Sequence, residues 1–287
     1  MSTLVWFDDE VRPADEPVVT ALDRGLLVGD GVFDTCVVVD GRPFALRRHV
    51  ARLARSAERV GLPAPPADVV TRAALDLAAR LDGPTGRLRI TWTAGPAEGG
   101  PARTGTTPTL LLTAETHPVA HPSAASAQAP VRTALVTVPW VRNERSPLVG
   151  VKSTSYAENV LAIEYARRHG GTEAVLANTR DELCEGGASN LFLETDGELL
   201  TPPLDSGCLA GVTRELVLEW GAAAGLPVRE ATVPLADFRA ADHAAVTSAT
   251  RGIVAADILD GRKLRPGPVT LEMQRVFAER VAQDLDP

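Results

Sequence analysis

Lysine is rare in this chain, and one lysine lies where it could do chemistry. Of the 29 basic residues, only Lys152 and Lys263 are lysines, and the rest are arginines. Lys152 lies in VGVKSTSY, between valines and small residues, just before a predicted helix. A guanidinium stays charged, whereas a partly desolvated lysine amine can lose its proton and attack a carbonyl. Lys152 is therefore a candidate Schiff-base lysine, the alternative being an ordinary solvated surface lysine.

Two further segments could bind parts of a planar, phosphorylated ligand. Glu185 precedes two glycines, which would let its carboxylate approach such a ligand closely, although a glutamate in an ordinary turn looks the same. In LAGVTRELVLEW, the residues Gly211, Val212 and Thr213 open a predicted helix, whose first N–H groups favour a phosphate. Thr213 as a simple helix cap is the commoner case.

Two weaker signals complete the set of candidates. Thr247, Ser248 and Thr250 in AVTSATRG could supply further donors to a phosphate. Arg52 in RRHVARL could pair with a phosphate dianion or merely lie on the solvated face of a helix. Each signal alone carries little information.

The elements that position these residues alternate between strands and helices. Asp40-Gly41 between two β-rich runs predicts a hairpin over residues 32–45. The Pro-, Ala- and Ser-rich segment HPVAHPSAASAQAP predicts an interdomain linker at 118–130. We therefore expect an α+β chain with domains at 1–117 and 131–287, the second containing Lys152 and the phosphate-binding residues. The main predicted helices lie at 46–61, 65–81, 156–170 and 211–225, and the strands at 86–95, 107–115, 132–139, 173–178 and 190–195.

Composition excludes several classes of protein. The formal net charge of −8 argues against a general nucleic-acid-binding or anionic-membrane surface. No apolar run approaches the ~20 residues of a membrane span, and the N-terminus does not resemble a signal peptide. Cys36, Cys184 and Cys208 have no metal-binding spacing and are odd in number, which favours a reduced, cytoplasmic enzyme.

Taken in order, the candidate segments resemble a known family. They are DRGLLVGDGVFDT, HVARL, VKSTSYAENVLA, CEGGASNLFL, TPPLDSGCLAGVTRE and AVTSAT. This set resembles the fold-type IV pyridoxal-phosphate enzymes, the class-IV aminotransferase family. The resemblance implies a two-domain α+β fold with pyridoxal 5′-phosphate in the interdomain cleft, and a homodimer that completes the active site.

The resemblance also implies a role for each candidate. Lys152 would form the Schiff base with the cofactor and later move a proton. Glu185 would keep the pyridine nitrogen protonated, so that the ring accepts electrons. Tyr156 would lie beside the ring, and Asn190 would shape the glutamate loop. The residues expected to hold the phosphate are Arg52, Val212, Thr213, Ser248 and Ala249.

The substrate side is less determined. Phe33 stands where D-amino-acid aminotransferases of the best-known type have a tyrosine, and the loop with Arg103 lacks their Arg-x-His motif for the substrate carboxylate. Alternation in GRLRITWT puts Arg87 and Arg89 on one strand face, and alignment with the family turns Arg89 toward the pocket. Arg24 lies in the segment that reaches the partner's active site in these dimers. Arg89 and Arg24 are candidates to bind a substrate carboxylate, although either could be a surface arginine.

Thr35 keeps a second reaction open, because Phe-x-Thr in GDGVFDT resembles the aminodeoxychorismate lyases of the family. Transamination between a D-amino acid and a 2-oxo acid ranks first, and 4-amino-4-deoxychorismate lyase, which gives p-aminobenzoate and pyruvate, follows closely. Branched-chain L-amino-acid transamination is third. A pyridoxal-phosphate-binding protein without turnover is disfavoured, because Tyr156 and Glu185 accompany Lys152.

Overall fold

A computed structural model describes residues 3–97, 102–103, 107–117 and 133–287, and these residues form two compact units. Unit 1 comprises Met1–Val119, Val151–Tyr156 and Asp284–Pro287, and unit 2 comprises Ala120–Gly150 and Ala157–Gln283. The predicted linker at 118–130 lies outside the described residues. Mixed helices and sheets in both units confirm the α+β class.

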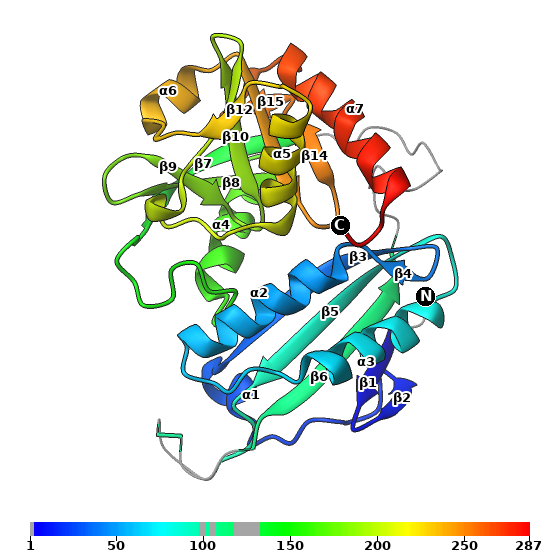
Figure 1. Cartoon of the computed structure of the whole chain (residues 1–287). Helices are drawn as coiled ribbons and strands as arrows, with labels where there is room; N and C mark the ends of the chain where they lie inside the picture. The colour runs from blue at the N-terminus through cyan, green and yellow to red at the C-terminus, as the bar shows by residue number, and fades with distance from the viewer. Residues whose placement is uncertain (1–2, 98–101, 104–106, 118–132) are drawn as a thin grey trace. The chain divides into compact units, whose positions relative to one another are not determined.

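In the described part of unit 1, one six-stranded antiparallel sheet has the order β2-β1-β6-β5-β3-β4. Figure 1 shows helices α2 and α3 side by side across one face of this sheet, where they bury apolar residues such as Leu53 and Leu77 against Leu88 and Ile90. The elements are β1 (Thr3–Phe7), β2 (Glu10–Pro13), α1 (Arg24–Val28), β3 (Gly31–Val39), β4 (Arg42–Pro43), α2 (Leu46–Arg59), α3 (Ala67–Ala79), β5 (Thr85–Thr93) and β6 (Thr109–Thr116).

Local sequence patterns explain the strands that carry the candidates of unit 1. Asp40 and Gly41 have φ angles of 47° and 74°, the left-handed pair that a tight two-residue hairpin requires, and so β3 and β4 form the predicted hairpin. In β5, Leu88 and Ile90 are buried, Arg89 is partly buried and Arg87 is exposed, which confirms the predicted alternation.

Unit 2 contains, among its described residues, two five-stranded sheets with the orders β12-β11-β10-β13-β14 and β16-β15-β7-β8-β9. One hydrophobic cluster joins them, with Leu135 and Val175 from one sheet and Leu191 and Val246 from the other. The elements are β7 (Ala134–Arg142), α4 (Ala157–Arg168), β8 (Glu173–Asn178), β9 (Leu183–Gly186), β10 (Asn190–Thr195), β11 (Glu198–Thr201), the 3₁₀ helix η1 (Leu204–Ser206), α5 (Val212–Ala223), β12 (Val228–Glu230), α6 (Leu235–Ala240), β13 (His243–Ser248), β14 (Gly252–Ala255), β15 (Ile258–Leu259), β16 (Arg262–Lys263) and α7 (Pro268–Gln283).

The segment Val151–Tyr156 differs from the expected division of the chain. The sequence places Lys152 in a domain of 131–287, but in the structure the segment packs with unit 1. The reason is a set of hydrogen bonds between this segment and the start of β3, which no local pattern reveals. The phosphate-binding candidates Thr213 and Ser248 belong to unit 2.

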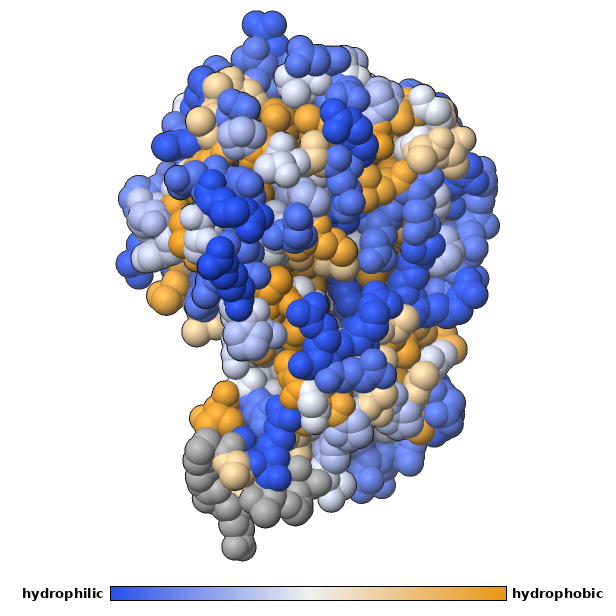
Figure 2. All heavy atoms as spheres, turned by 60° about the vertical axis from the view of Figure 1, so that its left-hand side comes forward, coloured by the Kyte–Doolittle hydropathy of each residue, from blue (hydrophilic) through white to orange (hydrophobic). Residues whose placement is uncertain are grey.

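The surface carries mixed side chains. On the face that Figure 2 shows, small groups of apolar side chains are interspersed with charged and polar ones. Within the described ranges, no helix is both long and apolar enough to span a membrane.

Candidate active site

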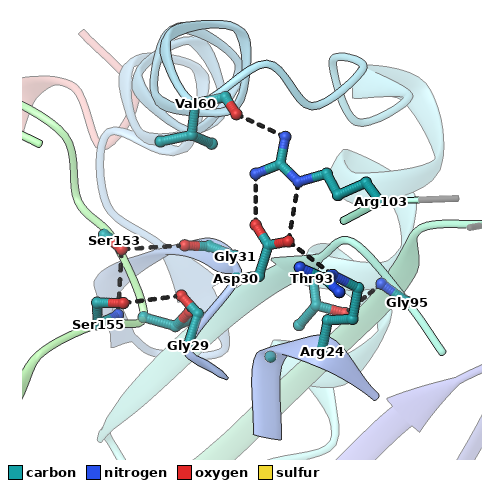
Figure 3. Close-up of polar contacts among 12 residues, drawn as sticks. Arg24, Gly29, Asp30, Gly31, Val60, Thr93, Gly95, Arg103, Ser153 and Ser155 are labelled. Carbon is teal, nitrogen blue, oxygen red and sulfur yellow. Dashed lines mark hydrogen bonds and ion pairs between the residues drawn. The ribbon is translucent and has the colours of Figure 1, made fainter. Parts of the chain in front are cut away.

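Residues 152–155 form hydrogen bonds to residues 29–33 through backbone groups and side-chain hydroxyls. The Phe33 N–H donates to the Lys152 carbonyl oxygen at 2.9 Å, and the Thr154 N–H donates to Gly31 O at 2.9 Å. The Ser155 hydroxyl donates to Gly29 O at 3.0 Å, as Figure 3 shows. The GDGVF motif therefore has a structural task, which is to hold the segment that carries Lys152.

Two aromatic rings lie near the amine of Lys152. Its Nζ lies 4.6 Å from the ring centroid of Phe33 and 5.7 Å from that of Tyr156. The two rings meet edge to face, with centroids 5.3 Å apart. Lys152 is partly buried, and its role as a Schiff-base lysine stays a prediction.

Arg89 lies over the same Phe33 ring. Its guanidinium carbon is 3.7 Å from the ring centroid, and its Nε donates to the Thr91 hydroxyl at 3.2 Å. Burial lowers the pKa of Arg89, and nearby Tyr156 opposes that shift. Among the described residues, no carboxylate lies within ion-pair distance of Arg89, whereas its neighbour Arg87 pairs with Glu115 at 2.5 Å. A partly buried guanidinium in this state is suited to bind an anion.

Arg52 is fixed in a buried cluster with Asp34 and His49. Its Nε and Nη2 donate to the two Asp34 carboxylate oxygens at 2.8 and 2.7 Å. His49 Nδ1 lies 2.7 Å from Asp34 Oδ1, and the Thr35 N–H donates to the same oxygen at 2.7 Å. Burial alone would raise the pKa of Asp34, but the charge of Arg52 and the contact with His49 hold it well below its usual range.

Burial also lowers the pKa of His49, although the Asp34 carboxylate opposes this. We conclude that Asp34 and Arg52 carry the charges and that His49 is neutral. The sequence did not predict this cluster, although His49 and Arg52 lie three residues apart on one helix face, a spacing that could have indicated it. Its effect is to hold the Arg52 guanidinium in one orientation.

Arg24 is engaged by an acidic residue of its own unit. Figure 3 shows Asp30 between Arg24 and Arg103. Arg24 Nε donates to Asp30 Oδ2 at 2.9 Å and its Nη1 donates to Ala102 O at 3.2 Å, while Arg103 Nε contacts Asp30 at 2.8 Å. The hydrogen bond from Arg103 is the main reason that the pKa of Asp30 is lowered. A substrate carboxylate at Arg24 would have to compete with Asp30, and the role of Arg24 stays a prediction.

In unit 2, Glu185 is held at the end of β9 by a backbone amide and an arginine. The Leu209 N–H donates to Glu185 Oε2 at 2.9 Å, and Arg142 Nε lies 3.2 Å from Glu185 Oε1. Asn190 Nδ2 donates to Leu209 O at 2.9 Å, so Asn190 holds the loop before α5 whose Leu209 N–H contacts Glu185. No sequence signal had pointed to Arg142.

The N-terminus of α5 offers backbone donors. Gly211 is its N-cap and makes no side-chain cap bond, which also means that Thr213 is not the capping residue. A Cβ at Gly211 would lie 2.0 Å from Asn190 Oδ1, so a larger residue there would displace the Asn190 side chain. Val212 and Thr213 are buried at the first turn. N–H groups in this position are suited to an anionic group.

The end of β13 supplies hydroxyl groups. Thr247 pairs with Asn190 across β10 and β13, and its buried hydroxyl has no hydrogen-bond partner among the described residues. Ser248 ends the strand, and Ala249 follows in a turn. Within unit 2, the Glu185 carboxylate, the N–H groups at the start of α5 and the unpartnered Thr247 hydroxyl are groups of the kind that bind pyridoxal 5′-phosphate. The placement of the cofactor in an interdomain cleft stays a prediction.

Comparisons with known proteins identify the family of this chain. The family model of amino-transferase class IV matches residues 31–257. D-alanine aminotransferase of Listeria innocua is 27% identical over 296 residues, which cover 97% of this chain and 96% of that protein. A bifunctional aminodeoxychorismate lyase / D-amino acid transaminase of Mycobacterium tuberculosis is 29% identical over 290 residues, 97% of each.

Solved structures show the same fold. A branched-chain aminotransferase from Thermoproteus uzoniensis with norvaline superimposes with a TM-score of 0.87 at 27% identity, covering 98% of this chain and 95% of that one. An aminotransferase from Brucella abortus bound to the cofactor PLP superimposes with a TM-score of 0.86 at 25% identity. The match covers 99% of this chain and 100% of that one. The expected fold-type IV architecture and its pyridoxal-phosphate cofactor are thereby confirmed.

Proposed function

Since the chain belongs to the class IV aminotransferase family, we propose that it transfers the amino group of a D-amino acid to a 2-oxo acid. Support comes from two relatives that each align with 97% of this chain, one named for D-alanine and one for D-amino acids. The proposal takes Lys152 as the residue that binds pyridoxal 5′-phosphate and moves the substrate proton.

Within this proposal each residue has a separate task. When bound, the cofactor supplies an electron sink for the bond broken at the substrate α-carbon. The Lys152 amine takes that proton and returns it. Glu185, held by Arg142 and the Leu209 N–H, keeps a proton at the ring nitrogen. The phosphate is assigned to Arg52, Val212, Thr213, Ser248 and Ala249.

The observation that carries the choice of substrate is the position of Arg89. Its guanidinium and the Lys152 amine both lie over the Phe33 ring, at 3.7 and 4.6 Å from its centroid. An α-amino acid carries its carboxylate on the same carbon as its amino group, so a substrate that reacts beside the Lys152 amine would present its carboxylate to the Arg89 guanidinium. We take Arg89 as the residue that binds the carboxylate, with Phe33 and Thr35 beside it and Arg24 as a second candidate.

Arg87 provides a matched control for this proposal, because it lies on the same strand but is exposed and paired with Glu115. Arg89→Leu should weaken transition-state binding of D-alanine by about 2–4 kcal/mol if a buried charge pair is lost. It should affect (R)-1-phenylethylamine, which has no carboxylate, far less. Arg87→Leu should leave the reaction rates of both substrates unchanged. Half-reaction kinetics with both substrates measure this, and equal losses for both would show that Arg89 does not recognise a carboxylate.

The lyase reaction is the second candidate, favoured by Thr35 after Phe33 and by the bifunctional relative. Its substrate also carries carboxylates, so Arg89 serves either reaction. Release of p-aminobenzoate from aminodeoxychorismate, without loss of cofactor absorbance on D-alanine, would favour the lyase.

We also propose a homodimer that shares its active sites. Residues around α1 present apolar side chains to solvent in the single chain: Leu22, Leu26, Leu27 and Val28 are each more than half exposed. A second copy would bury them. Leu26→Glu with Leu27→Glu should therefore give monomers by analytical ultracentrifugation, and an unchanged dimer would place the interface elsewhere.

A cytoplasmic location is proposed on the basis of the thiols. Cys36, Cys184 and Cys208 are all free and buried, as is usual in a reducing compartment. Recovery of the protein in the extracellular fraction of its native cells would contradict this location.

A further inference from the structure

The buried Glu173 and the partly buried Arg251 form an ion pair that the proposed reaction does not use. Glu173 begins β8, and its side chain is only 3% exposed. Arg251 Nη2 donates to Glu173 Oε2 at 2.5 Å. A buried carboxylate without a partner would be costly, so the pair holds two distant parts of the chain together.

One end of this pair supports the turn that follows Glu185. The other oxygen of Glu173 accepts the Ala188 N–H at 3.3 Å. A Cβ at Gly187 would lie 3.3 Å from that oxygen, and one at Gly186 would lie 3.2 Å from the carboxylate carbon. The two glycines thus let the backbone pack directly on Glu173. The position of the turn after Glu185 therefore depends on the Glu173 carboxylate.

The other end of the pair orients a hydroxyl of the phosphate-binding segment. Arg251 Nε donates to Ser248 Oγ at 3.1 Å. A guanidinium can only donate, so the serine oxygen must accept, and the serine proton remains for another acceptor. The hydrogen bonds among the described residues give that proton no acceptor. Ser248 is thereby prepared to donate to an anion.

We propose that Arg251 and Glu173 are positioning residues for the cofactor. They fix the turn after Glu185 relative to Ser248 and direct the Ser248 proton toward the cofactor phosphate. The proposal rests on the assignment of Ser248 to the phosphate, but not on the identity of the amino-acid substrate. It predicts that loss of Arg251 weakens the binding of the phosphate in particular.

The test compares pyridoxal 5′-phosphate with pyridoxal, which lacks the phosphate. Each is titrated by absorbance into the full chain freed of cofactor. Arg251→Gln should raise the dissociation constant of pyridoxal 5′-phosphate about tenfold, as expected for one hydrogen bond to a charged group, and leave that of pyridoxal unchanged. Arg229→Gln is the matched control, because it breaks a surface pair with Glu198 in the same unit.

Two further variants separate positioning from folding stability. Arg251→Lys keeps a positive charge for Glu173 but lacks the second planar donor, so it should restore the thermal stability of the cofactor-free protein without restoring phosphate affinity. In a Ser248→Ala background, Arg251→Gln should cost little additional affinity, because it acts through the serine hydroxyl.

Equal weakening of pyridoxal and pyridoxal 5′-phosphate by Arg251→Gln, or fully additive effects with Ser248→Ala, would overturn the proposal. So would an unchanged affinity for pyridoxal 5′-phosphate. These results are independent of the proposed reaction. A wild-type protein that shows the expected phosphate-specific losses but does not transaminate D-amino acids would support this inference and refute the proposed function.

Discussion

The Phe33 N–H donates to the carbonyl oxygen of Lys152 at 2.9 Å, so strand β3 and the backbone of Lys152 are fixed to each other. The Phe33 ring also lies 4.6 Å from the lysine amine. A single residue thus holds the lysine backbone and limits solvent around its side chain. The consequence is that Lys152, and not the exposed Lys263, has the environment of a nucleophilic amine.

Borohydride reduction of the native protein should therefore attach a pyridoxyl group to Lys152. Reduction converts the cofactor–lysine linkage into a stable bond, which peptide mapping by mass spectrometry locates. Lys152→Ala should lose the visible absorbance of bound cofactor and all turnover, and Lys263→Ala should lose neither. A pyridoxyl label on Lys263 would refute the assignment.

Glu185→Gln should leave cofactor bound but slow proton abstraction by several orders of magnitude, each factor of ten being about 1.4 kcal/mol of barrier. A neutral amide still accepts the Leu209 N–H but cannot keep a proton on the ring nitrogen. Single-turnover kinetics with deuterated substrate measure this step. The control is Glu198→Gln, a surface carboxylate paired with Arg229, and rates near those of the wild type for Glu185→Gln would exclude its role.

His49 should make the folded state sensitive to mild acid. Burial lowers its pKa in the folded state, with Asp34 opposing, so the unfolded chain binds more protons once the pH falls below about 6.5. The free energy of unfolding then decreases as the pH falls, until the folded-state pKa is reached. His49→Asn keeps a donor for Asp34 but cannot titrate.

Urea unfolding on either side of about pH 6.5 should thus show a smaller acid-induced loss for His49→Asn than for the wild type, by up to about 1.4 kcal/mol per pH unit. His169→Asn, at an exposed histidine, is the control. If acid lowered the free energy of unfolding equally in the wild type and in His49→Asn, the buried histidine would not titrate on unfolding.

Local patterns in the sequence were sufficient for much of the fold. The hairpin at Asp40-Gly41 and the alternation of Leu88, Arg89 and Ile90 follow from turn chemistry and strand geometry, which depend on neighbours in the chain. The packing of Val151–Tyr156 with unit 1 was not predictable in this way. It depends on hydrogen bonds between residues more than a hundred positions apart, which leave no periodic signal.

The candidate site was predictable to a similar degree. The amine, the glutamate and the helix N-terminus follow from residue types and order. Their partners do not: Arg142 beside Glu185 and Arg251 beside Glu173 come from other strands and turns, and a chain rich in arginine gives no reason to single them out. Asp34 is an exception, because it lies within the motif that the resemblance had already marked.

The half-reaction of the purified protein with single enantiomers tests the central claim most directly. The visible absorbance of the bound cofactor is followed after addition of D-alanine, L-alanine or L-leucine without a 2-oxo acid, and the product is identified. We predict loss of absorbance with stoichiometric pyruvate from D-alanine, and recovery when 2-oxoglutarate is added. A D-amino-acid transaminase would be contradicted if only L-leucine lowered the absorbance. It would also be contradicted if the absorbance stayed unchanged with all three amino acids.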